Sequence, residues 1–271
     1  MPEGHALHRL ARRQQHQFGG QRLAVSSPQG RFGPEAAILD GLVFADAEAW
    51  GKHLIYRFDD GPEDRRAPRL VHIHLGIYGA FTEEALPMPA PVGQIRLRMV
   101  GEELGIDLRG PNACELYTPE DLAALVGRLG PDPLRADADP EPAWSAITRS
   151  RRAIGSLVMD QRVIAGIGNI YRAEVLFRAG IDPLRPGTSL SRDEFDAVWA
   201  DLVLLMPIGM QTGRIHVIRP EDDHGPPSYA PNRPRTYVYR RAGEPCRLCG
   251  TPILWRELEG RNLFWCPACQ H

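Results

Sequence analysis

The chain begins with apolar positions at helical spacing. Between residues 5 and 18 the side chains expected on one face are Leu7, Leu10, Ala11, Gln14 and Phe18, which predicts an amphipathic helix. Over the next hundred residues apolar and polar side chains alternate in short runs that are separated by Gly, Pro and Asp. These runs predict strands near residues 53–58, 71–75 and 95–99, and they favour an antiparallel β-sandwich. A helix over residues 119–129 is expected to close this region.

The second half of the chain has a helical pattern. Residues 130–142 contain four prolines and several aspartates, which predicts a linker. Ser191 and Glu194 have the spacing of a capping box, and the apolar face that continues from them comprises Phe195, Val198, Leu202 and Leu205. Residues 221–235 are rich in Pro and polar side chains, as in an irregular loop. We therefore expect a multidomain α+β protein with a sandwich over 1–130, a linker over 131–142, a helical domain over 143–230 and a last module over 231–271.

Composition places the chain among globular proteins. With 271 residues, 43% of them hydrophobic and 24% charged, it can bury a substantial core. No apolar run is long enough to span a bilayer and no signal peptide is evident, so we expect an intracellular, cytoplasmic protein. The net charge of −2 does not indicate a nucleic-acid binder. However, residues 101–143 carry ten acids and three arginines, whereas residues 231–271 carry seven arginines and three acids, so the C-terminal end could follow a phosphate backbone.

The basic residues include a single lysine. Of the 32 Lys and Arg residues, 31 are arginine and one is Lys52, at the predicted start of a strand. Chance survival in an arginine-biased sequence would explain it. We favour a site that requires a compact ammonium group, because a planar guanidinium cannot replace one.

Four cysteines near the C-terminus have the spacing of a metal site. Two CxxC pairs, Cys246 with Cys249 and Cys266 with Cys269, are separated by sixteen residues, which fits one tetrahedral zinc. Disulfides are the alternative, disfavoured in a reducing compartment. All four ligand positions would be filled by thiolates and the module has few apolar side chains, so one structural Zn²⁺ is expected. Cys114 is interpreted as a buried small hydrophobe.

The histidines predict no second metal site. His72 and His74 lie on one face of a predicted strand, and the sequence supplies no third ligand. We interpret them as surface or hydrogen-bonded core residues.

Two glycine-containing turns are candidates for phosphate contacts. Residues 259–262 predict a hairpin turn with Arg261 at its tip, where an arginine is either solvated surface or a DNA contact. Residues 164–171 contain Gly166 and Gly168 just before a helical pattern, and amides at a helix N-terminus can hold a phosphate. An ordinary turn between helices is the alternative explanation, and the third glycine of a dinucleotide-binding motif is absent.

Taken together, the ordered motifs resemble those of the formamidopyrimidine-DNA glycosylase and endonuclease VIII family. The resemblance covers the whole chain and rests on Pro2-Glu3-Gly4, Gly51-Lys52-His53-Leu54, Gly166-Ile167-Gly168-Asn169-Ile170-Tyr171 with Glu174, and Cys266-Pro267-Ala268-Cys269-Gln270. It implies a β-sandwich catalytic domain, a helix-two-turns-helix domain and a zinc finger. It also implies a monomer that binds duplex DNA containing oxidised bases or abasic sites, with the damaged nucleotide flipped out of the stack.

The resemblance assigns roles to individual residues. After removal of the initiator methionine, Pro2 would be the amine nucleophile, which forms an iminium with the opened sugar. Glu3 would be the acid/base group, and Lys52 would contact phosphate and the sugar. Asn169, together with the amide of Gly168, and Arg261 would grip phosphates on either side of the flipped nucleotide.

The loop after the second predicted strand is expected to fill the gap in the DNA. Ile77 and Tyr78 are candidates for the wedge and the stacking group, although core positions would explain them nearly as well. No purine-branch wedge or damaged-guanine capping loop is recognisable in this loop or in residues 221–235, which favours oxidised pyrimidines and the endonuclease VIII branch. The alternatives are an 8-oxoguanine and formamidopyrimidine glycosylase, and a non-catalytic zinc protein that binds DNA.

Overall fold

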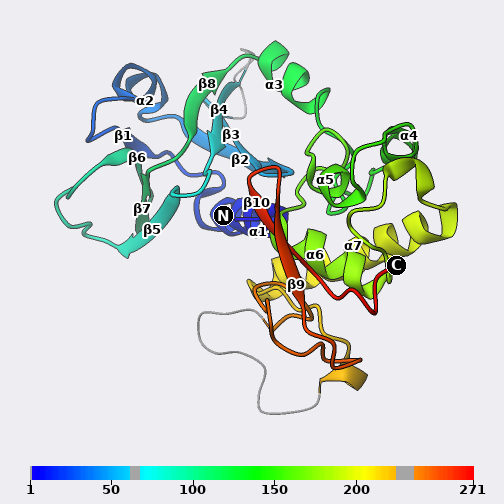
Figure 1. Ribbon diagram of the computed structural model, residues 1–271. Helices are drawn as coiled ribbons and strands as arrows, with labels where there is room; N and C mark the ends of the chain where they lie inside the picture. Colours follow the sequence, from blue (N-terminus) through cyan, green and yellow to red (C-terminus); the bar gives the residue numbers. More distant parts are fainter. Residues whose placement is uncertain (1, 62–67, 224–234) are drawn as a thin grey trace. The chain divides into compact units, whose positions relative to one another are not determined.

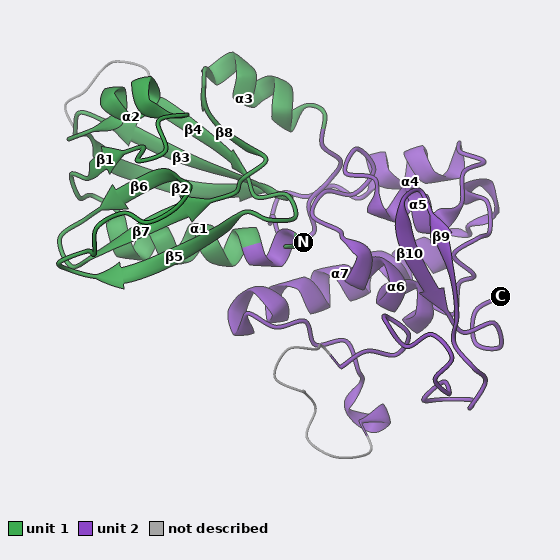
Figure 2. Cartoon of the chain, turned by 60° about the vertical axis from the view of Figure 1, so that its left-hand side comes forward, with its two compact units in different colours: residues 1–3, 7–128 green, residues 4–6, 129–271 purple. Residues whose placement is uncertain are grey.

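The computed structural model describes residues 2–61, 68–223 and 235–271 (Figure 1). The chain divides into two compact units, one of residues 1–3 and 7–128 and the other of residues 4–6 and 129–271 (Figure 2). Among the described residues no helix has the length and hydropathy needed to cross a membrane.

The first unit contains two four-stranded antiparallel sheets, which form the predicted β-sandwich. Their strand orders are β1-β6-β7-β5 and β2-β3-β4-β8. The strands are β1 (Ala24–Ser26), β2 (Val43–Trp50), β3 (His53–Asp59), β4 (Arg69–His74), β5 (Ala80–Ala85), β6 (Ile95–Val100), β7 (Leu104–Arg109) and β8 (Ala113–Tyr117). The accompanying helices are α1 (Gly4–Phe18), α2 (Gly33–Leu39) and α3 (Pro119–Val126).

The strand pattern follows from which faces are covered. In β6 the side chains of Ile95, Leu97 and Met99 are buried and their neighbours are only half-buried, as expected for a strand with one face on the core. Strand β3 is buried on both faces, because Ile55 packs in a separate cluster with Leu125 of α3. The helix predicted over 119–129 therefore covers the outer face of this sheet, and it ends earlier than expected, at Val126.

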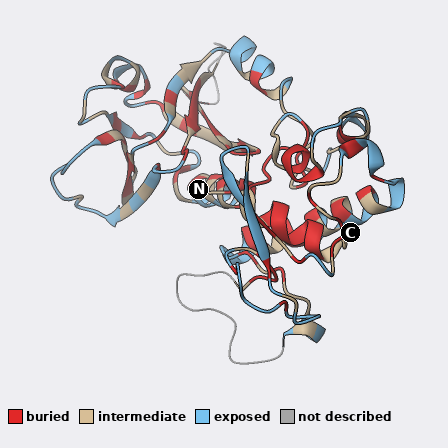
Figure 3. Cartoon of the chain, in the orientation of Figure 1, coloured by how far each residue is buried: buried red, intermediate tan, exposed pale blue. Residues whose placement is uncertain are grey.

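The second unit is built on helices. They are α4 (Glu141–Thr148), α5 (Ile154–Met159), α6 (Asn169–Arg178) and α7 (Arg192–Thr212), with the short 3₁₀ helices η1 (Gly187–Ser189) and η2 (Pro220–Asp222). The capping box predicted at the start of α7 is present, since Ser191 Oγ accepts from the Glu194 N–H and the Glu194 carboxylate accepts from the Ser191 N–H. Helix α6 is the centre of the unit and is buried along most of its length (Figure 3).

The C-terminal ribbon shares its core with α6. Strands β9 (Leu254–Leu258) and β10 (Arg261–Trp265) form an antiparallel hairpin, and four of the five residues of β9 are exposed. The buried side chains of the ribbon pack on Phe177 of α6, whose ring stacks on Tyr237 with centroids 4.7 Å apart. The ribbon is thus held partly by a helix outside it.

Candidate functional site

The N-terminal residues are fixed through a glycine. Glu3 is buried and lies in extended conformation directly before α1. The next amide, the N–H of Gly4, donates a 2.8 Å hydrogen bond to the carbonyl oxygen of Gly166. A Cβ atom on Gly4 would lie 2.7 Å from the Cα atom of Gly166, so a residue larger than glycine would force the two backbones apart. The backbone next to Pro2 and Glu3 is therefore held at the glycine-rich turn.

Lys52 lies in the tight turn that joins β2 to β3. Trp50 and His53 are the last paired residues of these strands, and Gly51 has a φ of 59°, which glycine adopts without strain. The strand begins one residue after Lys52, at His53. The lysine is only 8% exposed, which is low for an ammonium group and distinguishes it from a solvated surface lysine.

Three histidines cluster beside this turn. The ring nitrogens His53 Nδ1 and His72 Nε2 are 2.8 Å apart, and the His53 ring also lies against His74, with centroids 5.0 Å apart. Burial, then neighbouring positive charge, lowers the pKa of His53 to about 3 and that of His72 to about 4, so both are neutral near pH 7. The interpretation of His72 as a hydrogen-bonded core residue is confirmed, and its partner is a third histidine that the sequence did not reveal.

The glycine-rich turn is held by one amide side chain. Gln161 Nε2 donates 2.8 Å hydrogen bonds to the carbonyl oxygens of Met159 and Ile167, and its Oε1 accepts a 2.9 Å bond from the Gly166 N–H. Gly166 has a φ of 87° and Gly168 precedes α6 in extended conformation. The predicted turn before a helix N-terminus is confirmed, and Gln161 holds its backbone at three points.

Asn169 and the tip of the C-terminal hairpin lie together. Asn169 Nδ2 donates a 3.0 Å hydrogen bond to the carbonyl oxygen of Asn262, the residue after Arg261. The fully buried Arg172 donates to the same oxygen at 3.2 Å and also to Asn169 Oδ1. Asn169 is thus hydrogen-bonded to the residue that follows Arg261, although the two segments are far apart in sequence.

The predicted hairpin turn is present, but its two tip residues are Glu259 and Gly260, and Arg261 lies directly after them. Glu259 and Gly260 have φ angles of 48° and 70°, as in the two-residue turns that match the twist of antiparallel strands. Arg261 follows as the first residue of β10 and is exposed. The tip therefore carries a guanidinium group that solvent, or a DNA phosphate, can reach.

Glu174 ties α6 to the ribbon. Its carboxylate is fully buried and accepts three backbone hydrogen bonds, from Tyr237 at 2.7 Å, Val238 at 3.0 Å and Tyr239 at 2.8 Å. Burial raises the pKa of Glu174, and the three N–H groups oppose that rise because they favour the ionised form. Glu174, which follows the glycine-rich turn in sequence, therefore has a structural role in holding the ribbon on α6.

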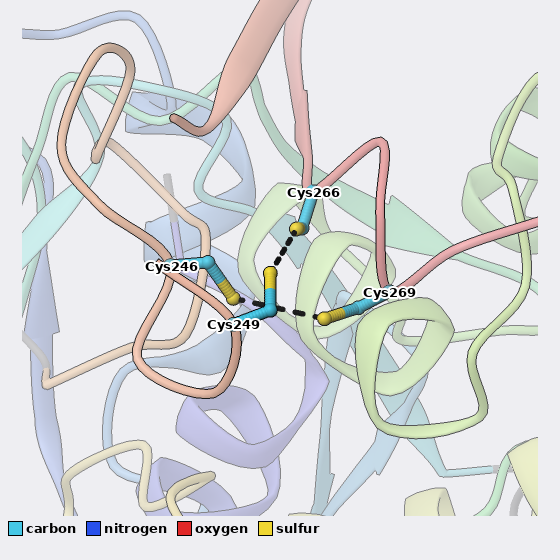
Figure 4. Close-up of side chains that lie close together, drawn as sticks. All are labelled: Cys246, Cys249, Cys266 and Cys269. Carbon is cyan, nitrogen blue, oxygen red and sulfur yellow. Dashed lines mark hydrogen bonds between the residues drawn. The ribbon is translucent and has the colours of Figure 1, made fainter. Parts of the chain in front are cut away.

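The four cysteines of the ribbon converge on one point (Figure 4). Their sulfur atoms all lie within 4.8 Å of one another, with Cys246 and Cys269 at 3.8 Å and Cys249 and Cys266 at 3.5 Å. A tetrahedral zinc with Zn–S bonds of about 2.3 Å requires sulfur separations of about 3.8 Å. The sulfurs are too far apart for disulfides, so the donor set fits a metal ion.

The remaining candidates are also accounted for. Ile77 is 53% exposed and Tyr78 is 82% exposed, so the alternative that they are core side chains is wrong. Cys114 is buried, as predicted, and burial raises the pKa of its thiol to about 12. Of the predicted irregular loop over 221–235, residues 224–234 lie outside the described residues.

Known proteins resemble this chain over its whole length. The family model described as the formamidopyrimidine-DNA glycosylase H2TH domain matches residues 129–219. Endonuclease 8 1 of Mycobacterium tuberculosis is 60% identical, with all of both chains covered. Formamidopyrimidine-DNA glycosylase of Methylococcus capsulatus is 32% identical over 86% of this chain and 83% of the relative.

Solved structures show the same fold. MutM in complex with DNA containing carbocyclic 8-oxo-G superimposes with a TM-score of 0.80 at 21% identity, with all of both chains covered. Lactococcus lactis Fpg in complex with abasic-site DNA gives 0.79 at 21% identity over 99% of both chains.

The sandwich, the H2TH helices and the cysteine ribbon together define a class of DNA-repair protein, and this chain belongs to the formamidopyrimidine-DNA glycosylase and endonuclease VIII family. Within it, the full-length 60% identity places the chain in the endonuclease VIII branch.

Proposed function

We propose that the protein is a bifunctional DNA glycosylase and AP lyase of base excision repair that removes oxidised bases, preferentially pyrimidines, and cleaves the strand by β,δ-elimination. Its family supports the glycosylase activity. The observation that carries the proposal is the N-terminal Pro2-Glu3 pair, whose neighbouring backbone is fixed by the 2.8 Å bond between Gly4 and Gly166. A nucleophile needs such a defined position, because misplacement by about 1 Å can cost about 100-fold in rate.

The chemistry follows from a secondary amine. Once Met1 is removed, the unprotonated Pro2 nitrogen attacks C1′ of the damaged nucleotide, the bond from C1′ to the base breaks, and the base leaves with a proton. Opening of the sugar ring leaves a cationic iminium between Pro2 and C1′. The iminium acidifies the C2′ protons, so loss of one expels the 3′ phosphate, and a second elimination expels the 5′ phosphate. Water then releases the sugar fragment from Pro2.

Glu3 and Lys52 supply the proton transfers. Glu3 is buried beside the nucleophile in sequence, where a carboxyl group can protonate the ring oxygen as the sugar opens and later accept protons. The buried Lys52 ammonium offers three rotatable donors for the sugar and its phosphate. A guanidinium group would be too wide and too weakly acidic for both tasks.

DNA phosphates are bound by two segments, the glycine-rich turn and the hairpin tip. The Gly168 amide and Asn169, at the N-terminus of α6, bind one phosphate, and the exposed Arg261 binds another. The exposed Ile77 and Tyr78 fill the gap left by the flipped nucleotide. Bound Zn²⁺ would be held by the four cysteines and would supply folding stability to the ribbon, with no part in the chemistry.

Borohydride trapping on abasic DNA tests the nucleophile. The purified protein without Met1 should give a covalent adduct, and a chain with an extra residue before Pro2 should give none, because the amine is then an amide. The single lysine sharpens the test, since Pro2 and Lys52 carry the only aliphatic amines. Peptide mapping must place the adduct on Pro2, and Lys52→Arg must still form an adduct on Pro2, at a lower rate. An adduct on Lys52, or none despite correct processing, would refute the mechanism.

The substrate preference is tested with a panel of duplexes. We expect faster excision of thymine glycol and dihydrouracil than of 8-oxoguanine at equal enzyme concentration. The reverse order would retain the mechanism and assign the protein to the 8-oxoguanine and formamidopyrimidine activity.

A further inference from the structure

An ion-pair network holds the hairpin tip at Glu259. Arg152 Nη2 donates to both carboxylate oxygens of Glu259, at 3.1 Å and 3.0 Å, while its Nη1 donates to Asp160 Oδ2 at 2.8 Å. Arg152 lies just before α5, Asp160 just after it, and Glu259 in the hairpin turn. One guanidinium thus joins both ends of α5 to the tip, using the fork geometry in which arginine differs from lysine.

Arg261 lies between two anchored neighbours. On its N-terminal side Glu259 is held by Arg152, and on its C-terminal side the Asn262 carbonyl accepts from Asn169 and Arg172. Glu259 and Gly260 form a two-residue turn directly before Arg261, so the backbone leaves Arg261 little freedom. The direction in which Arg261 leaves the hairpin therefore depends on both anchors.

We propose that Arg152 and Glu259 are positioning residues that fix the hairpin tip and so preset Arg261 for a DNA phosphate. The inference rests on the proposed function, because it assigns the phosphate contact to Arg261. The three charged side chains are partly exposed, at 45% for Arg152, 48% for Glu259 and 26% for Asp160. Ion pairs with this exposure add little to folding stability. The network joins residues that are 107 positions apart in sequence, and we assign it a role in placing the hairpin tip.

The sign of one substitution tests the proposal. Glu259→Gln removes a negative charge from a surface expected to meet DNA, and electrostatics alone would tighten binding. If Glu259 positions Arg261, binding must weaken instead. Glu257→Gln is the matched control, because Glu257 lies exposed on the same hairpin and the change in charge is identical.

Fluorescence anisotropy with a duplex that contains a tetrahydrofuran abasic analogue gives the readout. The zinc-loaded full chain should bind about fivefold more weakly as Glu259→Gln, and as tightly or more tightly as Glu257→Gln. In an Arg261→Gln background Glu259→Gln should no longer weaken binding and should behave like Glu257→Gln, which a general loss of folding would not produce. Arg152→Gln should weaken binding, and adding Glu259→Gln to it should change the Kd little, because the two residues act through one contact.

The outcomes separate this proposal from the proposed function. Equal or tighter binding by Glu259→Gln, with wild-type protein still trapped on abasic DNA, overturns the positioning role alone. Failure of the wild-type protein to form a Pro2 adduct overturns the proposed function, whatever the anisotropy shows. Weakening that persists in the Arg261→Gln background would also refute the positioning role, since Glu259 would then act without Arg261.

Discussion

The sandwich and the C-terminal ribbon are stabilised in different ways. The sandwich buries large aromatic side chains from α1 and from the sheet that contains β2 and β3, namely Phe18, Phe44, Tyr56 and Phe58. The ribbon leaves most of β9 exposed and depends on four cysteines, one buried glutamate and packing on α6. Burial of apolar surface stabilises a region without a metal ion or a particular polar contact. A region with little buried apolar surface depends instead on a metal ion and on individual hydrogen bonds. The difference indicates that the two regions should respond differently to the same treatment.

Removal of the metal should give the largest effect. Cys266→Ser, or treatment with a strong chelator, should unfold the ribbon and weaken binding to abasic-analogue DNA by about 100-fold or more, because Arg261 loses its support. Far-UV circular dichroism should show the sandwich strands intact. Simultaneous loss of the sandwich would show that the two regions are not independent.

Gly4→Ala should separate position from stability. The added Cβ meets the Gly166 backbone at 2.7 Å, so the N-terminal segment must shift, and the rate of borohydride trapping should fall by about 100-fold. Gly33→Ala is the matched control, since a Cβ there has no neighbour within 4 Å among the described residues. Similar trapping rates for the two variants would show that the contact between Gly4 and Gly166 does not position the nucleophile.

Glu174→Gln should destabilise the ribbon more than the sandwich. A glutamine has one acceptor oxygen and a donor NH₂ in place of the second carboxylate oxygen, so at least one of three buried N–H groups loses its partner. We expect a loss of about 2 to 4 kcal/mol in the free energy of unfolding of the ribbon. Urea titration monitored by tryptophan fluorescence, to which Trp255 and Trp265 on the hairpin contribute, would measure this loss. The far-UV circular dichroism signal of the sandwich should not change.

Mild acid should destabilise the sandwich through two histidines, His53 and His72. Because the pKa values of His53 and His72 are lowered to about 3 and about 4, the unfolded chain binds more protons than the folded one below about pH 6.5. The stability of the sandwich is therefore fully present above pH 6.5 and falls between pH 6.5 and 4, by about 2 kcal/mol per histidine at pH 5.

His72→Gln should make that pH dependence shallower. Denaturant unfolding at pH 7 and pH 5 gives the measurement, and His16→Gln on the exposed side of α1 is the control. An unchanged slope in His72→Gln would assign the acid sensitivity to other groups.

Short sequence motifs correctly predicted the features that depend on residues close together in the chain. The capping box at Ser191 and the hairpin turn at Glu259 and Gly260 follow from short-range backbone chemistry, and the cysteine spacing follows from the geometry of a tetrahedral ion. The alternating run at residues 95–99 correctly predicted a strand because only one face of β6 is buried.

Contacts between distant residues left no such signal. Glu174 accepts from amides more than sixty residues away, and Arg152 meets Glu259 across 107 residues. Nothing in the neighbourhood of either residue specifies its partner, because the meeting depends on how α5, α6 and the ribbon pack. His53 was not predicted to join His72 and His74 for a related reason. The three rings meet because β3 pairs with β4 in the register that sets His53 opposite His74.

The bond between Gly4 and Gly166 also bears on the synthesis of the protein. A ribosome releases the N-terminal segment first, yet the carbonyl that receives it belongs to a turn made much later. A growing or truncated chain that stops before residue 166 has a free amine with no place to dock. The contact that holds the N-terminal segment therefore forms only after the second half of the chain has been made.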